Sequence, residues 1–232
     1  KIYVRNIKTN KEEELKITEE KVISPGISIG QKDKDTNIIR ISYDSPKTPS
    51  RTFEYNIETK EKKLLKEQII PSGHNRDDYI VERLNCESHD GRQVPMTITF
   101  HKKTKLDGSA HVLLYGYGSY GMSMGPSFSS TRLSLINRNI IWVTCHIRGG
   151  MERGMRWWKE GKMLNKKNTF SDFISCAKFL IEKKYTSKKK IIAYGGSAGG
   201  LLLGSTINQI PDLLLGAIMA VPFVDNLTTN MD

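Results

Sequence analysis

A serine lies among glycines at the end of an apolar stretch of the chain. The stretch reads Ile191-Ile192-Ala193-Tyr194-Gly195-Gly196-Ser197-Ala198-Gly199-Gly200. Its G-x-S-x-G pattern is typical of a nucleophile elbow, a tight turn that holds a serine hydroxyl between a strand and a helix. Such a turn strains the backbone of Ser197. Glycines at 195, 196 and 199 lack the Cβ atoms that would otherwise clash there. The Ala198 amide then points to where an oxyanion forms. The predicted chemistry is acyl transfer.

The segments on either side of Ser197 have the composition that an elbow needs. An apolar, β-prone run leads into the serine, and a helix-compatible apolar run follows it at residues 201–207. The alternative is a glycine-rich turn with an incidental serine, and these flanks favour the nucleophile over that alternative.

On both sides of the elbow, the hydrophobic pattern predicts alternating strands and helices. Strands are expected at 79–86, 93–101, 110–115, 139–145, 190–194 and, as a buried strand, 216–221. Asp90-Gly91 is a hairpin turn signal between the first two strands. Residues 128–137 are helix-compatible, and an apolar stripe after Thr169 predicts a core-facing helix with Thr169 and Asp172 as its capping box. This alternation predicts an α/β fold with a mostly parallel sheet and helices on both faces.

Residues 1–66 differ from the rest of the chain. They predict short strands at 1–7, 38–43 and 51–57, separated by polar turns, in the manner of a β-meander. A segment this short and this charged has little core of its own, so we expect it to be one repeat of a larger array. We expect residues 67–232 to form the second domain, the N-terminal part of an α/β-hydrolase domain whose last strand in this sequence is 216–221.

The composition excludes several classes of protein. The formal net charge is +11, but the basic residues are spread along the chain without interleaved aromatics, which argues against nucleic-acid binding. The longest nearly apolar run, 213–224, is too short to span a bilayer, so no membrane association is expected. Three well-separated cysteines favour buried thiols in a reducing compartment, and thus a cytoplasmic protein without a disulfide frame or metal site.

Several motifs occur in one characteristic order. They are Leu114-Tyr115-Gly116-Tyr117-Gly118-Ser119-Tyr120-Gly121, His146-Ile147-Arg148-Gly149-Gly150, Trp157-Trp158-Lys159-Glu160-Gly161-Lys162, Lys167-Asn168-Thr169-Phe170-Ser171-Asp172-Phe173, the elbow itself, and Val221-Pro222-Phe223-Val224-Asp225. This set resembles the prolyl oligopeptidase family of serine peptidases, and within it the oligopeptidase B group. The resemblance is strong over residues 66–232. It is weak over 1–65, which is similar to the last blade of that family's β-propeller.

The resemblance implies roles for individual residues. Ser197 would be the acylating nucleophile, and the Tyr117 hydroxyl would share the oxyanion hole with the Ala198 amide; the alternative for Tyr117 is a packing aromatic in a loop. Arg148, Gly149 and Gly150 would shape a loop near the site. The implied reaction is hydrolysis of short peptides after Lys or Arg, with no metal ion or organic cofactor.

The sequence departs from the family pattern at three places. Met151 stands where the family usually has a third glycine, so a different loop is expected there. Gly125 and Ser127 occupy places where bacterial oligopeptidase B often has acidic residues, so a preference for paired basic residues is not expected.

The third departure concerns the catalytic triad, which in this fold runs Ser, Asp, His along the chain. All five histidines precede Ser197, so we expect the catalytic acid and base to lie beyond Asp232, within the same protein or on a second chain. His146 follows a strand and is the histidine to consider as a substitute base. The alternatives to a peptidase are a catalytically inactive segment and an esterase of the same fold; the absence of an H-G-G-G motif argues against the esterase.

Overall fold

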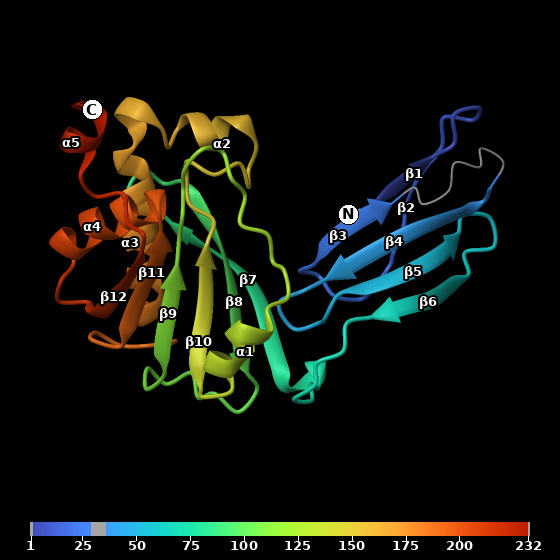
Figure 1. The fold of residues 1–232 in the computed structure, drawn as a ribbon, viewed down its shortest axis with the longest axis horizontal. Coiled ribbons are helices and arrows are strands. Elements are labelled where there is room, and N and C mark those ends of the chain that lie inside the picture. Colours follow the sequence, from blue (N-terminus) through green and yellow to red (C-terminus); the bar gives the residue numbers. More distant parts are fainter. Residues whose placement is uncertain (1, 29–35, 232) are drawn as a thin grey trace. The chain divides into compact units, whose positions relative to one another are not determined.

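The structure is a computed structural model that describes residues 2–28 and 36–231. The chain forms two compact units, Lys1–Arg76 with Gly125–Ser130, and Asp77–Met124 with Thr131–Asp232 (Figure 1). Helices in the described part of the chain all fall short of the length and apolar character that crossing a bilayer requires.

The first unit is built from antiparallel strands. β3 (Ser24–Ser28), β4 (Ile38–Asp44), β5 (Arg51–Asn56) and β6 (Lys62–Glu67) form one sheet in that order, and β1 (Tyr3–Arg5) pairs with β2 (Glu12–Glu14). Alternate residues of β4 and β5 point to the same side and are buried. Together with residues near the N-terminus they make a small core: Ile2, Leu15, Ile17, Ile41, Tyr43, Phe53 and Tyr55.

Two strands of this unit carry no clear signal in the sequence. β3 contains Pro25 and Gly26, which normally argue against a strand, but it lies at the sheet edge, where a missing N–H is tolerated. β6 is rich in lysine and almost wholly exposed, so its pattern lacks the expected alternation. The strands predicted at 38–43 and 51–57 form, whereas only residues 3–5 of the segment 1–7 are extended.

The second unit contains a mixed six-stranded sheet. Its order is β12 (Leu214–Ala220), β11 (Ile191–Gly196), β9 (His111–Tyr115), β10 (Ile140–Cys145), β8 (Gln93–His101) and β7 (Tyr79–Glu87). The first four strands run parallel to one another, and β8 runs antiparallel to both β10 and β7. The β7–β8 hairpin and the parallel strands are those that the sequence predicts.

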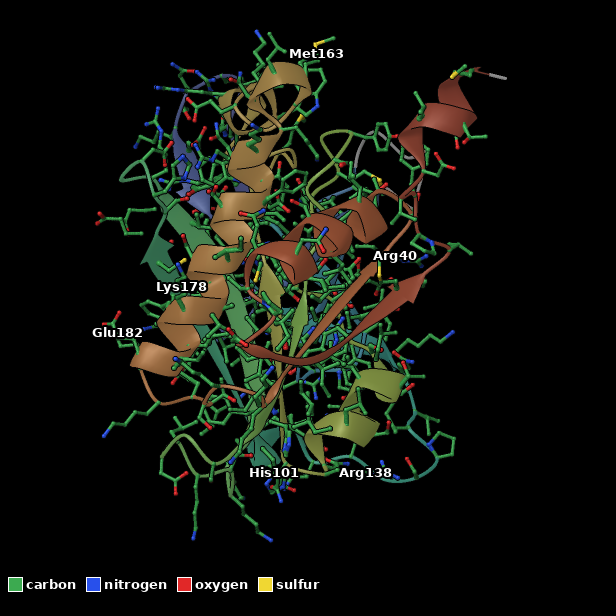
Figure 2. The ribbon with its side chains drawn as sticks, turned by 90° about the vertical axis from the view of Figure 1, so that its left-hand side faces the viewer. Arg40, His101, Arg138, Met163, Lys178 and Glu182 are labelled. Atoms are coloured by element: carbon green, nitrogen blue, oxygen red, sulfur yellow. The ribbon has the colours of Figure 1, made fainter. Side chains whose placement is uncertain are left out.

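Helices lie on both faces of this sheet. The longer ones are α1 (Ser130–Ile136), α3 (Lys167–Glu182) and α4 (Ala198–Gln209); the shorter ones are α2 (Met155–Lys159), α5 (Asn226–Met231) and the 3₁₀ turns η1 (Arg76–Asp78) and η2 (Met163–Asn165). Because β10 and β11 lie on opposite sides of β9, right-handed crossovers place α1 and α3 on opposite faces. Figure 2 shows α3, marked by Lys178 and Glu182, away from Arg138, which lies just after α1.

One hydrophobic core joins the sheet to α3 and α4. Phe173, Ala177 and Leu180 of α3 and Leu202 and Leu203 of α4 pack with buried residues of β8 to β11. This burial fixes the position of α4, and therefore of the turn that precedes it.

Two expectations about this unit are wrong. β12 forms, but only Leu214 of it is buried, since the strand lies at the sheet edge. Thr169 and Asp172 are not a capping box, because α3 begins at Lys167 and its N-cap is Lys166, three residues before Thr169. The Thr169 hydroxyl instead donates to the carbonyls of Arg148 and Gly161, and Asp172 binds Arg148.

Candidate active site

Ser197 lies in a sharp turn between β11 and α4. Its side chain is exposed, while the residues that follow it are buried. The backbone dihedrals are φ 53° and ψ −119°, a combination that non-glycine residues rarely adopt. Backbone hydrogen bonds hold this conformation: the Ser197 N–H donates to Ala220 O at 2.9 Å, and the Ser197 carbonyl accepts from Gly200 N at 2.8 Å and Phe223 N at 3.0 Å. The serine is therefore presented on a strained but well-supported turn.

The glycines around Ser197 allow close backbone contacts. A Cβ on Gly195 would lie 2.7 Å from Gly199 O, and one on Gly199 would lie 3.0 Å from Gly116 O. Gly196 is less restricted, since its Cβ would meet Ala220 O at 3.3 Å. Gly200, which the motif alone does not single out, has the least room, because a Cβ there would lie 2.4 Å from Pro222 Cβ.

Two hydrogen-bond donors of the predicted oxyanion hole belong to neighbouring parts of the fold. Ala198 is the first residue of α4, and the first amides of a helix have no acceptor within it. Tyr117 follows β9, the strand beside β11, and its Cδ2 lies 3.6 Å from the position that a Cβ on Gly199 would take. The structure thus brings Tyr117, Ala198 and Ser197 to the same end of the sheet.

Arg148 is a buried ion-pair centre behind this end of the sheet. Its guanidinium binds Asp172 through Nε (2.9 Å) and Nη2 (2.6 Å), and Asp90 through Nη1 (2.6 Å) and Nη2 (3.1 Å). Burial alone would lower the pKa of Arg148, but hydrogen bonds to the two carboxylates outweigh burial and raise it. Arg148 therefore remains charged, and its N–H and guanidinium both bind Asp172, which fixes the backbone at this position.

The glycines after Arg148 contact the loop that carries Tyr117. Gly149 has φ +97°, and a Cβ there would lie 2.0 Å from Gly118 O. Its carbonyl accepts a hydrogen bond from Gly121 N at 2.9 Å. A Cβ on Gly150 would meet the Glu152 carboxylate, and Met151 packs near Gly121. Gly149 and Gly150 therefore pack closely against the 118–122 segment.

His146 is not placed to act on Ser197. It follows β10, which is separated from β11 by β9. Its Nε2 lies 2.8 Å from Thr97 Oγ1 and 2.7 Å from Arg83 Nη1, so that nitrogen is already occupied. Burial lowers the pKa of His146, which keeps the ring neutral at pH 7. The histidine is a buried structural residue rather than a substitute base.

Asp172 is the buried partner of Arg148, a pairing that the sequence does not disclose. It shares the buried face of α3 with Phe173, Cys176 and Ala177 and is fully buried. A carboxylate on an apolar helix face needs a partner of opposite charge. The position of Asp172 on the apolar stripe therefore indicates a buried ion pair. The capping-box pattern explained the same residue more simply and concealed that signal.

Comparison with known proteins places these features in a family. Residues 126–232 match the prolyl oligopeptidase family. The chain is 40% identical over 230 residues to dipeptidyl aminopeptidase BI of Pseudoxanthomonas mexicana, covering 99% of this chain and 32% of that protein. It is 43% identical over 204 residues to protease 2 of Moraxella lacunata, covering 88% and 30%. The chain therefore spans about a third of the length of these curated relatives.

Solved structures agree with the sequence comparison. Oligopeptidase B from Leishmania major superposes with a TM-score of 0.87 at 34% identity, covering 99% of this chain and 33% of that one. Oligopeptidase B from Trypanosoma brucei, solved with covalently bound antipain, gives 0.84 at 36% identity, covering 93% and 31%. The expected α/β-hydrolase architecture is confirmed. By sequence and by fold, the chain is therefore similar to the prolyl oligopeptidase family of serine peptidases, over a stretch equivalent to about one third of the length of these relatives.

Proposed function

We propose that the chain is the nucleophile-bearing segment of a serine oligopeptidase, which hydrolyses short peptides through an acyl-enzyme on Ser197. The observation that carries this proposal is the strained, exposed Ser197 at the β11–α4 turn, with Tyr117 and the Ala198 amide at the same end of the sheet. An activated serine beside preorganised hydrogen-bond donors is the arrangement that acyl transfer requires.

The proposed reaction proceeds in two steps. Ser197 Oγ attacks the scissile carbonyl carbon, its proton passes through a base to the leaving amine, and the C–N bond breaks to leave an ester. Water then attacks the ester, releases the acid and returns the proton to Ser197. In both steps the negatively charged oxygen accepts hydrogen bonds from the Ala198 N–H and the Tyr117 hydroxyl.

The base in this proposal comes from outside residues 1–232. No histidine follows Ser197 in the sequence, and His146 is engaged with Thr97 and Arg83. A serine without a base is a weak nucleophile at neutral pH. The curated relatives are about three times as long as this chain, which supports a further segment, or a second chain, as the source of the acid and base.

We propose short cytoplasmic peptides cut after Lys or Arg as the substrates. The choice of a basic residue rests on the similarity to oligopeptidase B of two organisms. The antiparallel sheet of the first unit would be one blade of a propeller that excludes folded proteins, and the three buried free thiols support a reducing compartment.

Fluorophosphonate labelling of residues 1–232 together with the segment proposed to supply the base tests whether Ser197 is activated. Labelling of the wild type that is lost in Ser197→Ala supports the proposal. Tyr117→Phe should slow labelling by about 10²–10³-fold, the range for loss of one oxyanion-hole donor. Tyr120→Phe, in the same loop and exposed, is the matched control and should label at the wild-type rate. Hydrolysis of arginyl against prolyl coumarylamides then tests the residue preference.

An inactive segment is the second candidate function. It is favoured by the engagement of His146 and by the lack of any histidine after Ser197. If Ser197 does not react with the fluorophosphonate even when the base-bearing segment is present and the protein is soluble and folded, the segment is inactive and the proposal is overturned.

A further inference from the structure

Lys166 lies in the second unit, and both of its backbone polar groups are hydrogen-bonded. It is between η2 and α3, near Met163, which Figure 2 labels at one end of the molecule. The Lys166 N–H donates to Met163 O at 3.0 Å, and its carbonyl accepts from Thr169 N at 3.0 Å. With both backbone groups bonded, the starting point of the side chain is fixed.

The Lys166 side chain reaches the loop that carries Tyr117. Its half-buried ammonium donates to Gly118 O at 2.6 Å and to Ser119 Oγ at 2.8 Å. Both acceptors are neutral oxygens. Burial lowers the pKa of Lys166 from its usual 10.5 to about 8, because little water remains to solvate the charge. Placing a cation here costs free energy, and hydrogen bonds from a charged donor are the compensating gain.

The residues on both sides of Tyr117 are therefore anchored. On one side, Gly116 N donates to Tyr194 O of β11 at 3.2 Å. On the other, Gly118 is held between Lys166 and Gly149. A residue whose two neighbours are fixed has little freedom to move its own side chain away from the elbow.

We propose that Lys166 is a positioning residue, which holds the 116–122 loop so that the Tyr117 hydroxyl faces the oxyanion of the reaction at Ser197. The proposal rests on the proposed function for the role of Tyr117, but the restraint on the loop is a separate physical claim. Lys166 acts through the Gly118 carbonyl and does not itself touch the reacting atoms.

The restraint is tested by hydrogen–deuterium exchange, which does not depend on activity. Gly121 N–H donates to Gly149 O and Met122 N–H donates to Ser119 O, so both amides report on the loop. Lys166→Met should speed their exchange roughly tenfold or more, the order expected when a hydrogen bond to a charged group is lost. Lys167→Met, an exposed neighbour, is the matched control and should leave both amides at the wild-type rate.

The catalytic role is tested by the labelling rate of Ser197 in the same variants. Lys166→Met should lower the maximal rate of fluorophosphonate inactivation about tenfold with little change in the half-saturating concentration. Lys166→Arg, which keeps a charged donor, should recover most of that rate. Recovery by Arg separates positioning from a general loss of folding.

The outcomes separate this proposal from the proposed function. Unchanged exchange in a folded Lys166→Met variant overturns the proposal whether or not Ser197 reacts. Faster exchange with an unchanged labelling rate also overturns it, since the loop would then move without effect on the site. If the wild type does not label at all, the peptidase proposal fails, and faster exchange in Lys166→Met still supports the restraint.

Discussion

Replacing Arg148 with methionine should destabilise the second unit strongly. Arg148 is 1% exposed and its partner Asp172 is fully buried. The substitution keeps the length of the side chain but leaves the Asp172 carboxylate without a counter-charge. The Ser88 hydroxyl at 2.6 Å and the backbone N–H of residue 148 at 3.0 Å would remain as its hydrogen bonds.

The expected cost is about 3–5 kcal/mol, the range for removing one member of a buried ion pair. Neutralising Asp90, the second carboxylate that binds Arg148, should cost much less stability. Asp90 is 35% exposed, so Asp90→Asn should cost at most about 1 kcal/mol. The difference between the two variants is larger than the error of an unfolding experiment.

Urea unfolding followed by tryptophan fluorescence measures this cost. All three tryptophans lie in residues 142–158, so the signal reports on the second unit alone. A double variant, Arg148→Met with Asp172→Leu, removes both charges and should recover about 2–3 kcal/mol of the loss. An Arg148→Met variant within about 1 kcal/mol of the wild type would show that Asp172 does not need the charge.

Further predictions concern the loop, the thiols and acid stability. Gly149→Ala should cost about 2–4 kcal/mol in the same urea assay, because the added Cβ would lie 2.0 Å from Gly118 O. Gly91→Ala, with a similar positive φ but open space around its Cβ, should cost only about 1 kcal/mol; equal costs would contradict the steric argument. All three cysteines are buried, so the native chain should react with a maleimide at least about 100-fold more slowly than a free thiol, and three equivalents should react in denaturant. Burial would raise the pKa of Asp90, but its hydrogen bond to Arg148 prevails and lowers the pKa below 3.8. The folded state then binds fewer protons than the unfolded state, so this contribution is present above pH 4 and is lost as the pH falls through the folded-state pKa. Unfolding of Asp90→Asn between pH 6 and pH 3 should show a smaller loss of stability than the wild type, and identical losses would refute the assignment.

Local signals made much of the second unit predictable. The hairpin around Asp90-Gly91 and the strand before Ser197 each carry their pattern within a few residues, and both form as expected. The turn at Ser197 needs small residues next to it, so its strained backbone could be expected from the motif.

Contacts between distant segments were not predictable in the same way. The roles of Asp172 and Lys166 depend on partners at positions 148 and 118, which no local pattern connects to them. Asp172 fitted a capping box, and Lys166 resembled any surface lysine in a basic segment. β3 was missed for a related reason, since Pro25 and Gly26 are acceptable only because the strand lies at a sheet edge.

The hydrogen bonds around Ser197 also determine when its strained backbone can form during synthesis. The strained turn is held by Ala220 and Phe223, which follow it in the chain, while β11 pairs with the much earlier β9. Synthesis proceeds from the N-terminus, so β7 to β10 are complete before any of these late partners exist. In a nascent chain that has not yet produced residues 220–223, Ser197 is an ordinary flexible hydroxyl. The reactive geometry of Ser197 therefore requires residues 220–223, which are synthesised after β7 to β11.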